Sequence, residues 1–385
     1  MEIKRPVIKS ENIRIIIYII FMFVVSRVSM YLLYMHEFTD PGVLDCIHKF
    51  NLWDTGWYEG YARGIIDGNY PWNYDGQQAW AFFPLYPLIL AACYRLLRFK
   101  LDIMVIGTLV SNACFLLTEY IAYKYIMLTR KSLKIAYAFI AFMSLGVYTF
   151  YFTITYTEAL YIFLMALSFY FMKKESYIAM GAAGALLSAS RNTGVLFVFV
   201  ILVWRIMVYV SEHGKEGRIG DFIILNLKNE RLVLGTVMVP AGIFAYIAFL
   251  TRKVGDGFAF VHVQRSWGRD YKGFFHVLYN SFVDVFPPDY LGVATLIAFL
   301  LIIYLTIRYR NYDEMILPVF VLFMGGSSGF MSVPRFMIGS YTLMLGFCEE
   351  YAGMNRTARI LISACAFLFE LVLIRQWLLE NAVLW

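Results

Sequence analysis

The stretch IRIIIYIIFMFVVSRVSMYLLY, residues 13–34, decides the fold class of this chain. It is apolar on almost every side of a helix, and about 20 such residues cross the roughly 30 Å hydrocarbon core of a bilayer. Strands of a transmembrane β-barrel would instead alternate apolar and polar residues, so a barrel is excluded. No small-residue cleavage site follows the stretch, and we therefore interpret it as the first membrane span rather than a signal peptide.

The composition of the whole chain agrees with a membrane protein. Hydrophobic residues make up 61% of the 385 residues and charged residues only 16%, which is too apolar for a soluble domain of this length. The net charge of +6 does not indicate nucleic-acid binding, because the basic residues lie in short connecting loops, where they orient a membrane protein. The five cysteines show no CxxC spacing, and packing is their expected role.

Further apolar stretches predict an all-α polytopic membrane protein with a single transmembrane domain over residues 1–385. We predict eleven spans, near 13–35, 103–128, 134–152, 157–172, 177–190, 193–210, 231–251, 290–307, 314–330, 335–352 and 358–379. The stretch 82–97 is ambiguous, because prolines begin it and arginines end it. It is too short for an ordinary span, so we expect a helix that lies at the interface or re-enters the membrane.

The distribution of basic residues predicts the orientation. If 82–97 does not span, the connections that fall on one face are all basic; they are 1–14, 129–134, 173–176, 211–231, 308–313 and 353–359. Cytoplasmic loops carry such an excess of Lys and Arg. Two long loops, 36–102 and 253–289, then share the non-cytoplasmic face, and we expect juxtamembrane helices in the first. No P-loop or GxGxxG fingerprint occurs, which argues against a nucleotide-driven enzyme.

The first long loop contains the strongest candidate for catalysis. Asp54 follows Trp53 and precedes Trp57, and a carboxylate among aromatic rings suits a general base. The alternative is that Asp54 only caps the helix that begins near Thr55. Farther along the same loop, aromatic residues and prolines alternate. They indicate either an anchor at the membrane surface or the place where a lipid-linked substrate gains access, and the candidate residues for that access are Phe82, Phe83, Pro84 and Tyr86.

Three arginines from distant segments are expected on the non-cytoplasmic side, Arg191 and Arg335 near the ends of spans and Arg265 in the second long loop. Arg191, Arg265 and Arg335 are more than topology needs, and phosphate is the natural partner of such a group. Glu158 either answers a helix dipole or pairs with an arginine, and a structural Arg191–Glu158 pair is the alternative to a phosphate site. Other candidates for contact with an anionic headgroup or a sugar are Trp53, Trp57, Asn192, His262, Gln264 and Trp267.

The sequence does not indicate a metal centre. The five histidines are scattered and form no HExxH motif. The first loop has five aspartates that could collect a cation, but no DxD pair occurs; they are Asp40, Asp45, Asp54, Asp67 and Asp75. We therefore expect no metal cofactor.

Six motifs, in order, resemble the PIG-V family, the second mannosyltransferase of GPI-anchor synthesis, and its bacterial relatives in the GT-C class of membrane glycosyltransferases. They cover nearly the whole chain: Trp53-Asp54, Ala81-Phe82-Phe83-Pro84-Leu85-Tyr86-Pro87, Tyr156-Thr157-Glu158-Ala159-Leu160, Ser190-Arg191-Asn192-Thr193-Gly194, Gln264-Arg265 before Trp267, and Pro334-Arg335-Phe336. The resemblance implies a GT-C-type helical bundle with its active site on the non-cytoplasmic face.

The resemblance also implies a reaction. A hexose, typically mannose, would pass with inversion from a polyprenyl-phosphate donor to a hydroxyl of a glycolipid or cell-envelope glycan. Asp54 would be the general base and the arginines would hold the donor phosphate. With no ER-retention ending, a bacterial plasma membrane is the expected location. The rival hypotheses are a transporter or flippase for a lipid-linked sugar, and an assembly subunit without catalysis.

Overall fold

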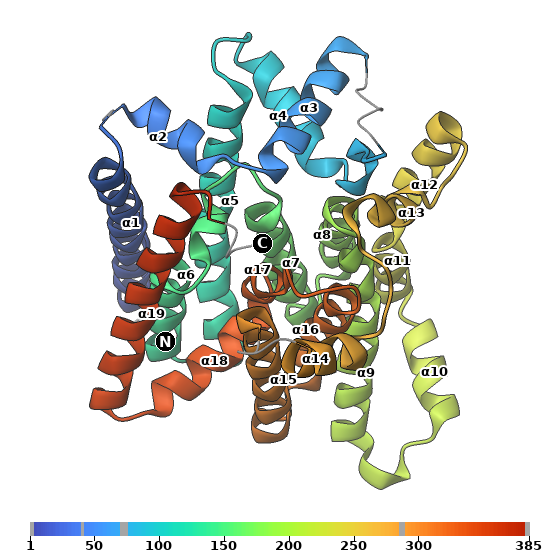
Figure 1. Ribbon diagram of the computed structural model, residues 1–385. Helices are drawn as coiled ribbons and strands as arrows, with labels where there is room; N and C mark the ends of the chain where they lie inside the picture. Colours follow the sequence, from blue (N-terminus) through green and yellow to red (C-terminus); the bar gives the residue numbers. More distant parts are fainter. Residues whose placement is uncertain (1–3, 40–41, 70–75, 285–288, 382–385) are drawn as a thin grey trace.

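A computed structural model describes residues 4–39, 42–69, 76–284 and 289–381, and within these ranges the chain is helical without any strand (Figure 1). Six of the described helical segments are long and apolar enough to cross a membrane. They are Glu11–Glu37, Ile103–Thr129, Asn192–His213, Glu230–Val254, Tyr290–Tyr309 and Arg356–Leu378. The prediction of a helical membrane protein is confirmed, whereas the number of eleven spans stays a prediction.

The α-helices follow one another with short connections. They are α1 (Lys4–Glu37), α2 (Val43–Phe50), α3 (Asp54–Asp67), α4 (Leu85–Leu96), α5 (Ile103–Thr129), α6 (Leu133–Leu145), α7 (Glu158–Lys173), α8 (Tyr177–Ser190), α9 (Phe197–His213), α10 (Ile219–Leu227), α11 (Glu230–Met238), α12 (Ala241–Val254), α13 (Ala259–His262), α14 (Phe274–Val283), α15 (Tyr290–Tyr309), α16 (Tyr312–Gly326), α17 (Val333–Ile338), α18 (Tyr341–Gly353) and α19 (Arg356–Leu378). Single 3₁₀ turns are η1 (Ala79–Ala81), η2 (Thr149–Phe152), η3 (Asn192–Leu196), η4 (Gly214–Glu216) and η5 (Val263–Trp267).

Several of the predicted spans are not single helices, among them 134–152 and 335–352. In the stretch 134–152, α6 ends at Leu145 because Gly146 takes an extended conformation, and the chain continues as η2. In the stretch 335–352, Gly339 and Ser340 separate α17 from α18. The first break brings the irregular backbone of η2, with Tyr148 and Tyr151, to the cavity described below, where non-helical segments can find polar partners.

The ambiguous stretch 82–97 forms α4, a helix of 12 residues, which is shorter than a membrane span. It packs against α3 and α5. The Tyr86 hydroxyl at its start is buried and donates to the Gly107 carbonyl of α5 at 3.0 Å, so α4 is fastened to the bundle. In Figure 1, α2, α3 and α4 lie together at the top of the molecule.

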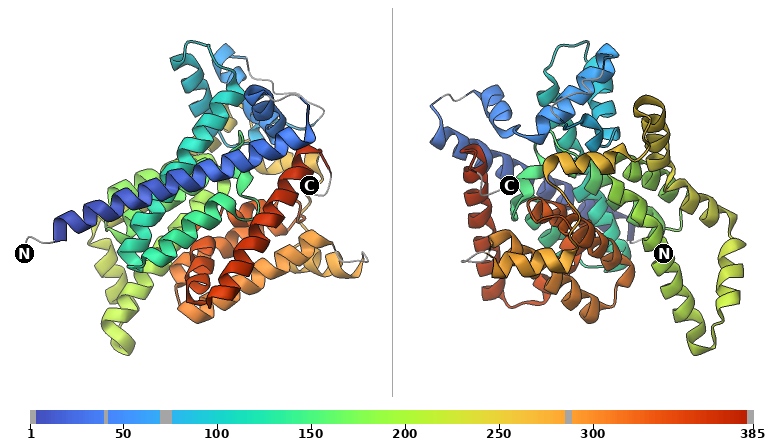
Figure 2. Two further views of the ribbon diagram at one scale, coloured as in Figure 1. Left: turned by 90° about the vertical axis from the view of Figure 1, so that its left-hand side faces the viewer. Right: turned by 45° about the vertical axis from the view of Figure 1, so that its right-hand side comes forward.

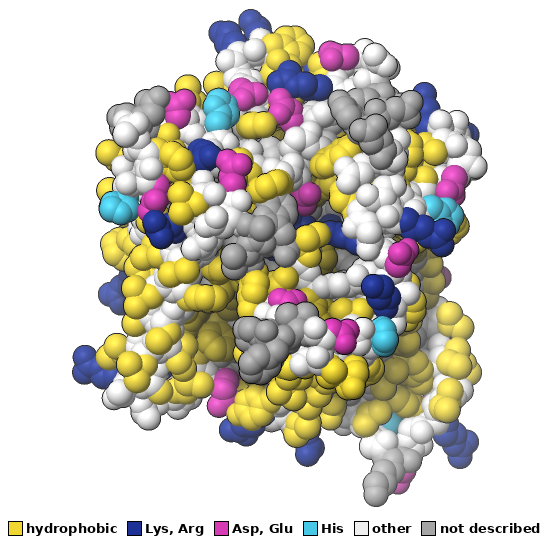
Figure 3. Space-filling model, viewed as in Figure 1, with side chains coloured by type: hydrophobic (Ala, Val, Ile, Leu, Met, Phe, Trp, Pro, Cys, Tyr) yellow, Lys and Arg dark blue, Asp and Glu magenta, His cyan; other side chains and the backbone are white. Residues whose placement is uncertain are grey.

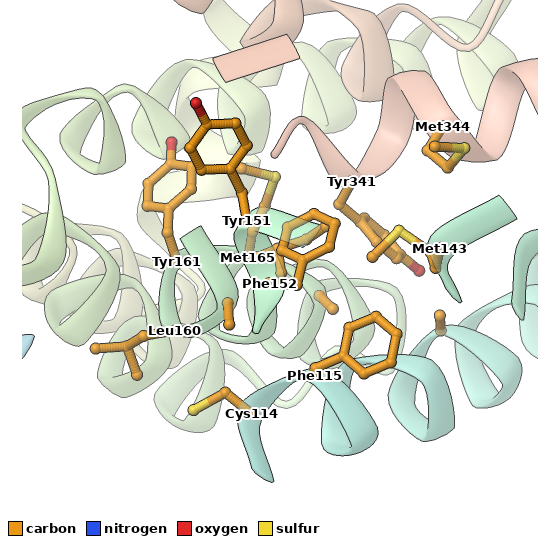
Figure 4. Close-up of a cluster of buried hydrophobic side chains, with 14 of the residues drawn as sticks. Cys114, Phe115, Met143, Tyr151, Phe152, Leu160, Tyr161, Met165, Tyr341 and Met344 are labelled. Carbon is orange, nitrogen blue, oxygen red and sulfur yellow. The ribbon is translucent and has the colours of Figure 1, made fainter. Parts of the chain in front are cut away.

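The core of the bundle centres on α5, α6, α7 and the segment around Tyr341. Large side chains meet there, among them Phe115, Phe152 and Met165, all of which are fully buried (Figure 4). Elsewhere, small residues let helices touch. A Cβ added at Gly235 of α11 would lie 2.2 Å from the Tyr177 carbonyl oxygen of α8, and such backbone contact is typical of helix pairs in membranes.

The two ends of the bundle carry different chemistry. In the left view of Figure 2, α1 runs from the N-terminus at one end of the molecule to the other end, where the C-terminus lies. The helix α7 begins at Glu158, beside the cavity, and its 16 residues end at Lys173, which pairs with Asp313 at 2.5 Å. At about 1.5 Å per residue, the Lys173–Asp313 pair and the cavity are therefore separated by roughly 24 Å.

Candidate functional site

A cavity of about 780 Å³ collects side chains from segments that are far apart in the sequence. Its walls come from the start of α3, from η1, from the end of α8 with η3, from the stretch 260–271, and from the stretch 321–336. Figure 3 shows a hollow near the centre of the face viewed, with Lys or Arg atoms inside it. A volume of this size is typical of sites that bind small molecules.

Asp54 lines the cavity and is held by a strained turn. The residue before it, Trp53, has φ 59° and ψ −109°, a conformation that costs a side-chain-bearing residue about 1–3 kcal/mol. The Tyr156 hydroxyl accepts a hydrogen bond from the Asp54 backbone N–H and donates one to the Leu52 carbonyl, each at 3.1 Å. These two bonds clamp both sides of Trp53. The turn therefore fixes where the Asp54 carboxylate points.

Asp54 begins a chain of alternating charges in the cavity wall. Arg335 Nη1 donates to Asp54 Oδ2 at 3.0 Å, and Arg335 Nε lies 3.0 Å from Glu158 Oε1. The same Glu158 oxygen accepts from Arg191 Nη1 at 3.3 Å. The four side chains come from α3, α17, α7 and the residue after α8. Their order is Asp54, Arg335, Glu158, Arg191.

A third guanidinium lies in the cavity outside this chain. Arg269 Nη1 donates to Gln264 Oε1 at 3.3 Å, and Nη2 lies 3.5 Å from Ser332 Oγ as a weak donor. Both partners are neutral, and no carboxylate of a described residue lies within 4.0 Å of the Arg269 nitrogens. Three cations that line the cavity thus face two carboxylates, Asp54 in the lining and Glu158 buried behind it. The site carries an excess of positive charge.

Burial and neighbouring charges shift the pKa of three side chains that line the cavity. Burial lowers the pKa of Arg269, and the positive charges of Arg335 and Arg191 lower it further. Burial, together with the Asp54 carboxylate, raises the pKa of the Tyr156 hydroxyl well above its ordinary value. Burial also raises the pKa of Tyr58, with Glu158 as the next cause. Both hydroxyls therefore stay neutral at physiological pH and can act as hydrogen-bond donors.

Aromatic rings form the rest of the wall. Trp57 stacks on Phe82 with centroids 5.7 Å apart, and Trp267 meets the edge of Trp57 at 5.6 Å. On the core side, Tyr151 and Tyr161 line the cavity, and Figure 4 shows their hydroxyls on the same side of the core. Rings of this kind stack on the apolar faces of sugars and on cations.

The structure brings together most of the residues that the sequence singled out. Those that line the cavity are Trp53, Asp54, Trp57, Phe82, Phe83, Arg191, Asn192, Gln264, Trp267 and Arg335. Glu158 is buried directly behind the two arginines with which it pairs. The alternative hypothesis, a structural Arg191–Glu158 pair, is therefore present in the structure, but it is part of a longer chain of charges.

Four predicted residues lie elsewhere. Arg265, within η5, is exposed and does not line the cavity. His262 is exposed and pairs with Asp256 at 2.7 Å, outside the lining. Tyr86 is buried against α5, and Pro84 is half-buried at the start of α4; neither lines the cavity, and their role in lipid access stays a prediction.

Sequence reasoning missed parts of the site or left them open. It indicated both arginines around Trp267 as possible contacts for an anionic headgroup but assigned only Arg265 to phosphate, whereas Arg269 is the one that lines the cavity. The clamp on Trp53 by Tyr156 is a contact between residues about a hundred positions apart. The stretch 327–332 lines the cavity with serines and glycine, and its small polar residues between two apolar stretches were the only signal.

A metal centre finds no support in the residues that the structure describes, where no three His, Cys, Asp or Glu side chains gather. Asp40 and Asp75 lie outside the described ranges. The absence of a metal cofactor stays an expectation. Neither comparison with protein-family models nor comparison with curated proteins gives a match for this chain. The resemblance to the PIG-V family therefore rests on the motifs alone.

Proposed function

We propose that this protein is an inverting membrane glycosyltransferase, with the cavity as its active site. It would transfer a hexose, with mannose the expected sugar, from a polyprenyl-phosphate donor to a hydroxyl of a glycolipid or cell-envelope glycan on the non-cytoplasmic face. One observation carries the proposal. The carboxylate of Asp54 lines the cavity and pairs with Arg335, one of three arginines there. The three arginines outnumber the two carboxylates beside them, so the net charge of the group is positive.

The reaction needs one base and one anion-binding group. The acceptor hydroxyl oxygen attacks C1 of the donor sugar from the side opposite the phosphate, and Asp54 takes the hydroxyl proton. The bond between C1 and the phosphate oxygen breaks, and polyprenyl phosphate leaves with both electrons. Because the attack is opposite to the leaving group, the configuration at C1 is inverted without a covalent intermediate.

The excess positive charge suits the leaving group. The donor is a phosphodiester with one negative charge, and the product phosphate monoester develops a second. Guanidinium groups placed where this charge develops stabilise the transition state more than the ground state. Arg269, whose two hydrogen-bond partners are neutral, and Arg335, which lines the cavity from α17, would perform this task.

The first test is transfer of radiolabelled mannose from a short-chain polyprenyl-phosphate mannose to extracted membrane lipids, with wild type beside Asp54→Asn. We expect labelled glycolipid with wild type and a loss of about 10²-fold or more in turnover with the variant, the usual range for removal of a general base. Asp67→Asn is the matched control, because Asp67 is exposed at the other end of α3 and does not line the cavity.

Two outcomes would contradict the proposal. If Asp54→Asn kept near-normal turnover, the base assignment would be wrong. If wild type in sealed vesicles moved the donor across the membrane with its sugar–phosphate bond intact, and formed no glycolipid with mannose, glucose or arabinose donors, the protein would be a transporter.

A further inference from the structure

The candidate base of the cavity, Asp54, is already paired with an arginine. Asp54 shares Arg335 with Glu158, and exposure falls steadily along these three side chains. The Asp54 side chain is 29% exposed, that of Arg335 is 13% exposed, and that of Glu158 is 1% exposed. Among these three side chains, Asp54 is therefore accessible from the cavity, whereas Glu158 is buried in the wall.

The guanidinium of Arg335 contacts two carboxylates through different nitrogens. Its Nε faces Glu158, while the Nη1 that reaches Asp54 lies on the cavity side. The rings of Tyr156 and Tyr151 lie 5.2 and 5.6 Å from its central carbon and hold it in place. Because Nε and Nη1 face different carboxylates, an exchange of the Nη1 partner would leave the Nε–Glu158 pair in place.

A phosphate that entered the cavity would compete with Asp54 for this guanidinium. Arginine binds phosphate oxygens in the same forked geometry in which it binds carboxylates. Arg269 supplies a nearby positive charge that forms no ion pair within 4.0 Å with a carboxylate of a described residue, and Arg191 is kept in reach by the same Glu158 oxygen that pairs with Arg335. An incoming anion therefore meets two guanidiniums that Glu158 aligns and one that is held by neutral groups.

We infer that Arg335 restrains Asp54 until the donor phosphate takes its place, and that Glu158 is the positioning residue which keeps Arg335 and Arg191 ready for that exchange. The inference rests on the proposed function. The base would be released only in a site that already holds the donor, so the acceptor hydroxyl would be activated after the donor has bound. Glu158 would act through the two arginines and would not touch the substrate.

The test is the affinity of the full-length protein in nanodiscs for geranyl phosphate, a prenyl phosphate without a sugar, measured by isothermal titration calorimetry. Removing the competing carboxylate in Asp54→Asn should tighten binding by about fivefold, the equivalent of a partly exposed ion pair. Glu158→Gln should weaken binding by about tenfold, because two guanidiniums lose their alignment. Glu158→Asp should restore part of the affinity, and Asp67→Asn should leave it unchanged.

The two substitutions are expected to move affinity in opposite directions, which a loss of folding cannot do. If Asp54→Asn binds geranyl phosphate no more tightly than wild type, the restraint by Arg335 is refuted, even where turnover is lost and the proposed function stands. If a folded Glu158→Gln, checked by its thermal midpoint, binds as well as wild type, the positioning role of Glu158 is refuted. If wild type itself does not bind geranyl phosphate, the phosphate site and with it the proposed function fail.

Discussion

At the scale of single residues, Arg265 and Arg269 form a natural matched pair. They stand four positions apart in one loop, but only Arg269 lines the cavity, while Arg265 is exposed. We expect Arg269→Gln to weaken binding of geranyl phosphate by about tenfold. A hydrogen bond to a charged group is worth roughly 1.5–3 kcal/mol, and in a half-buried site we expect the lower end of that range. Arg265→Gln should change affinity by less than about twofold. Calorimetry on both variants measures this, and equal losses would place the anion elsewhere.

The residue type alone was enough to identify some of the site residues but not others. An aspartate between tryptophans and arginines beside apolar stretches could be recognised from the sequence, because burying such groups is costly unless they are paired or functional. The sequence could not show which arginine of the second loop, Arg265 or Arg269, lines the cavity. That choice depends on the turn of η5 and on the contacts of Arg269 with Gln264 and Ser332, a residue more than sixty positions away.

At the scale of elements, the placement of Arg191 depends on how closely α8 approaches its neighbours. Gly235 of α11 touches the backbone of α8, and an added Cβ would lie 2.2 Å from the Tyr177 carbonyl oxygen. We expect Gly235→Ala to destabilise the protein by about 1–3 kcal/mol through overpacking. Gly220 of α10 has open space around it, so Gly220→Ala should be neutral or slightly stabilising, as helix propensity dictates. Thermal midpoints of the two variants compare these effects, and equal midpoints would show that α8 and α11 can separate.

The elements also show where apolar periodicity stops being informative. Long stretches such as 103–128 predicted their helices within a few residues, because length and hydropathy alone decide that a segment spans. The break after Leu145 and the break between α17 and α18 occur inside apolar sequence, at Gly146 and at Gly339. Glycine permits such a break but does not require one. The tertiary contacts that use the break, such as the hydrogen bond from the Phe150 N–H to Glu370 at 2.8 Å, are not readable from local sequence.

At the scale of the whole molecule, the end away from the cavity is closed by ion pairs that join helices distant in the chain. Arg130 after α5 pairs with Glu314 of α16 and with Glu349 of α18, while Lys173 of α7 pairs with Asp313. Glu314 is almost completely buried and also accepts a hydrogen bond from the Tyr125 hydroxyl. The basic residues that predicted a cytoplasmic face therefore also hold the helices together there. A loop charge from which the sequence analysis predicts orientation is, in the folded protein, a structural partner.

This arrangement predicts that stability and donor binding can be changed separately. Glu314→Gln leaves the Arg130 guanidinium buried with one partner fewer, and breaking a buried pair costs about 3–5 kcal/mol. Glu349 is more exposed than Glu314, so Glu349→Gln should cost less, within about 1 kcal/mol. Thermal midpoints should rank wild type, Glu349→Gln and Glu314→Gln in that order. Because the network lies at the far end of α7 from Glu158, the fraction of Glu314→Gln that folds should bind geranyl phosphate as wild type does. A loss of affinity in that folded fraction would mean that the two ends of the bundle are coupled, and that α7 transmits the change.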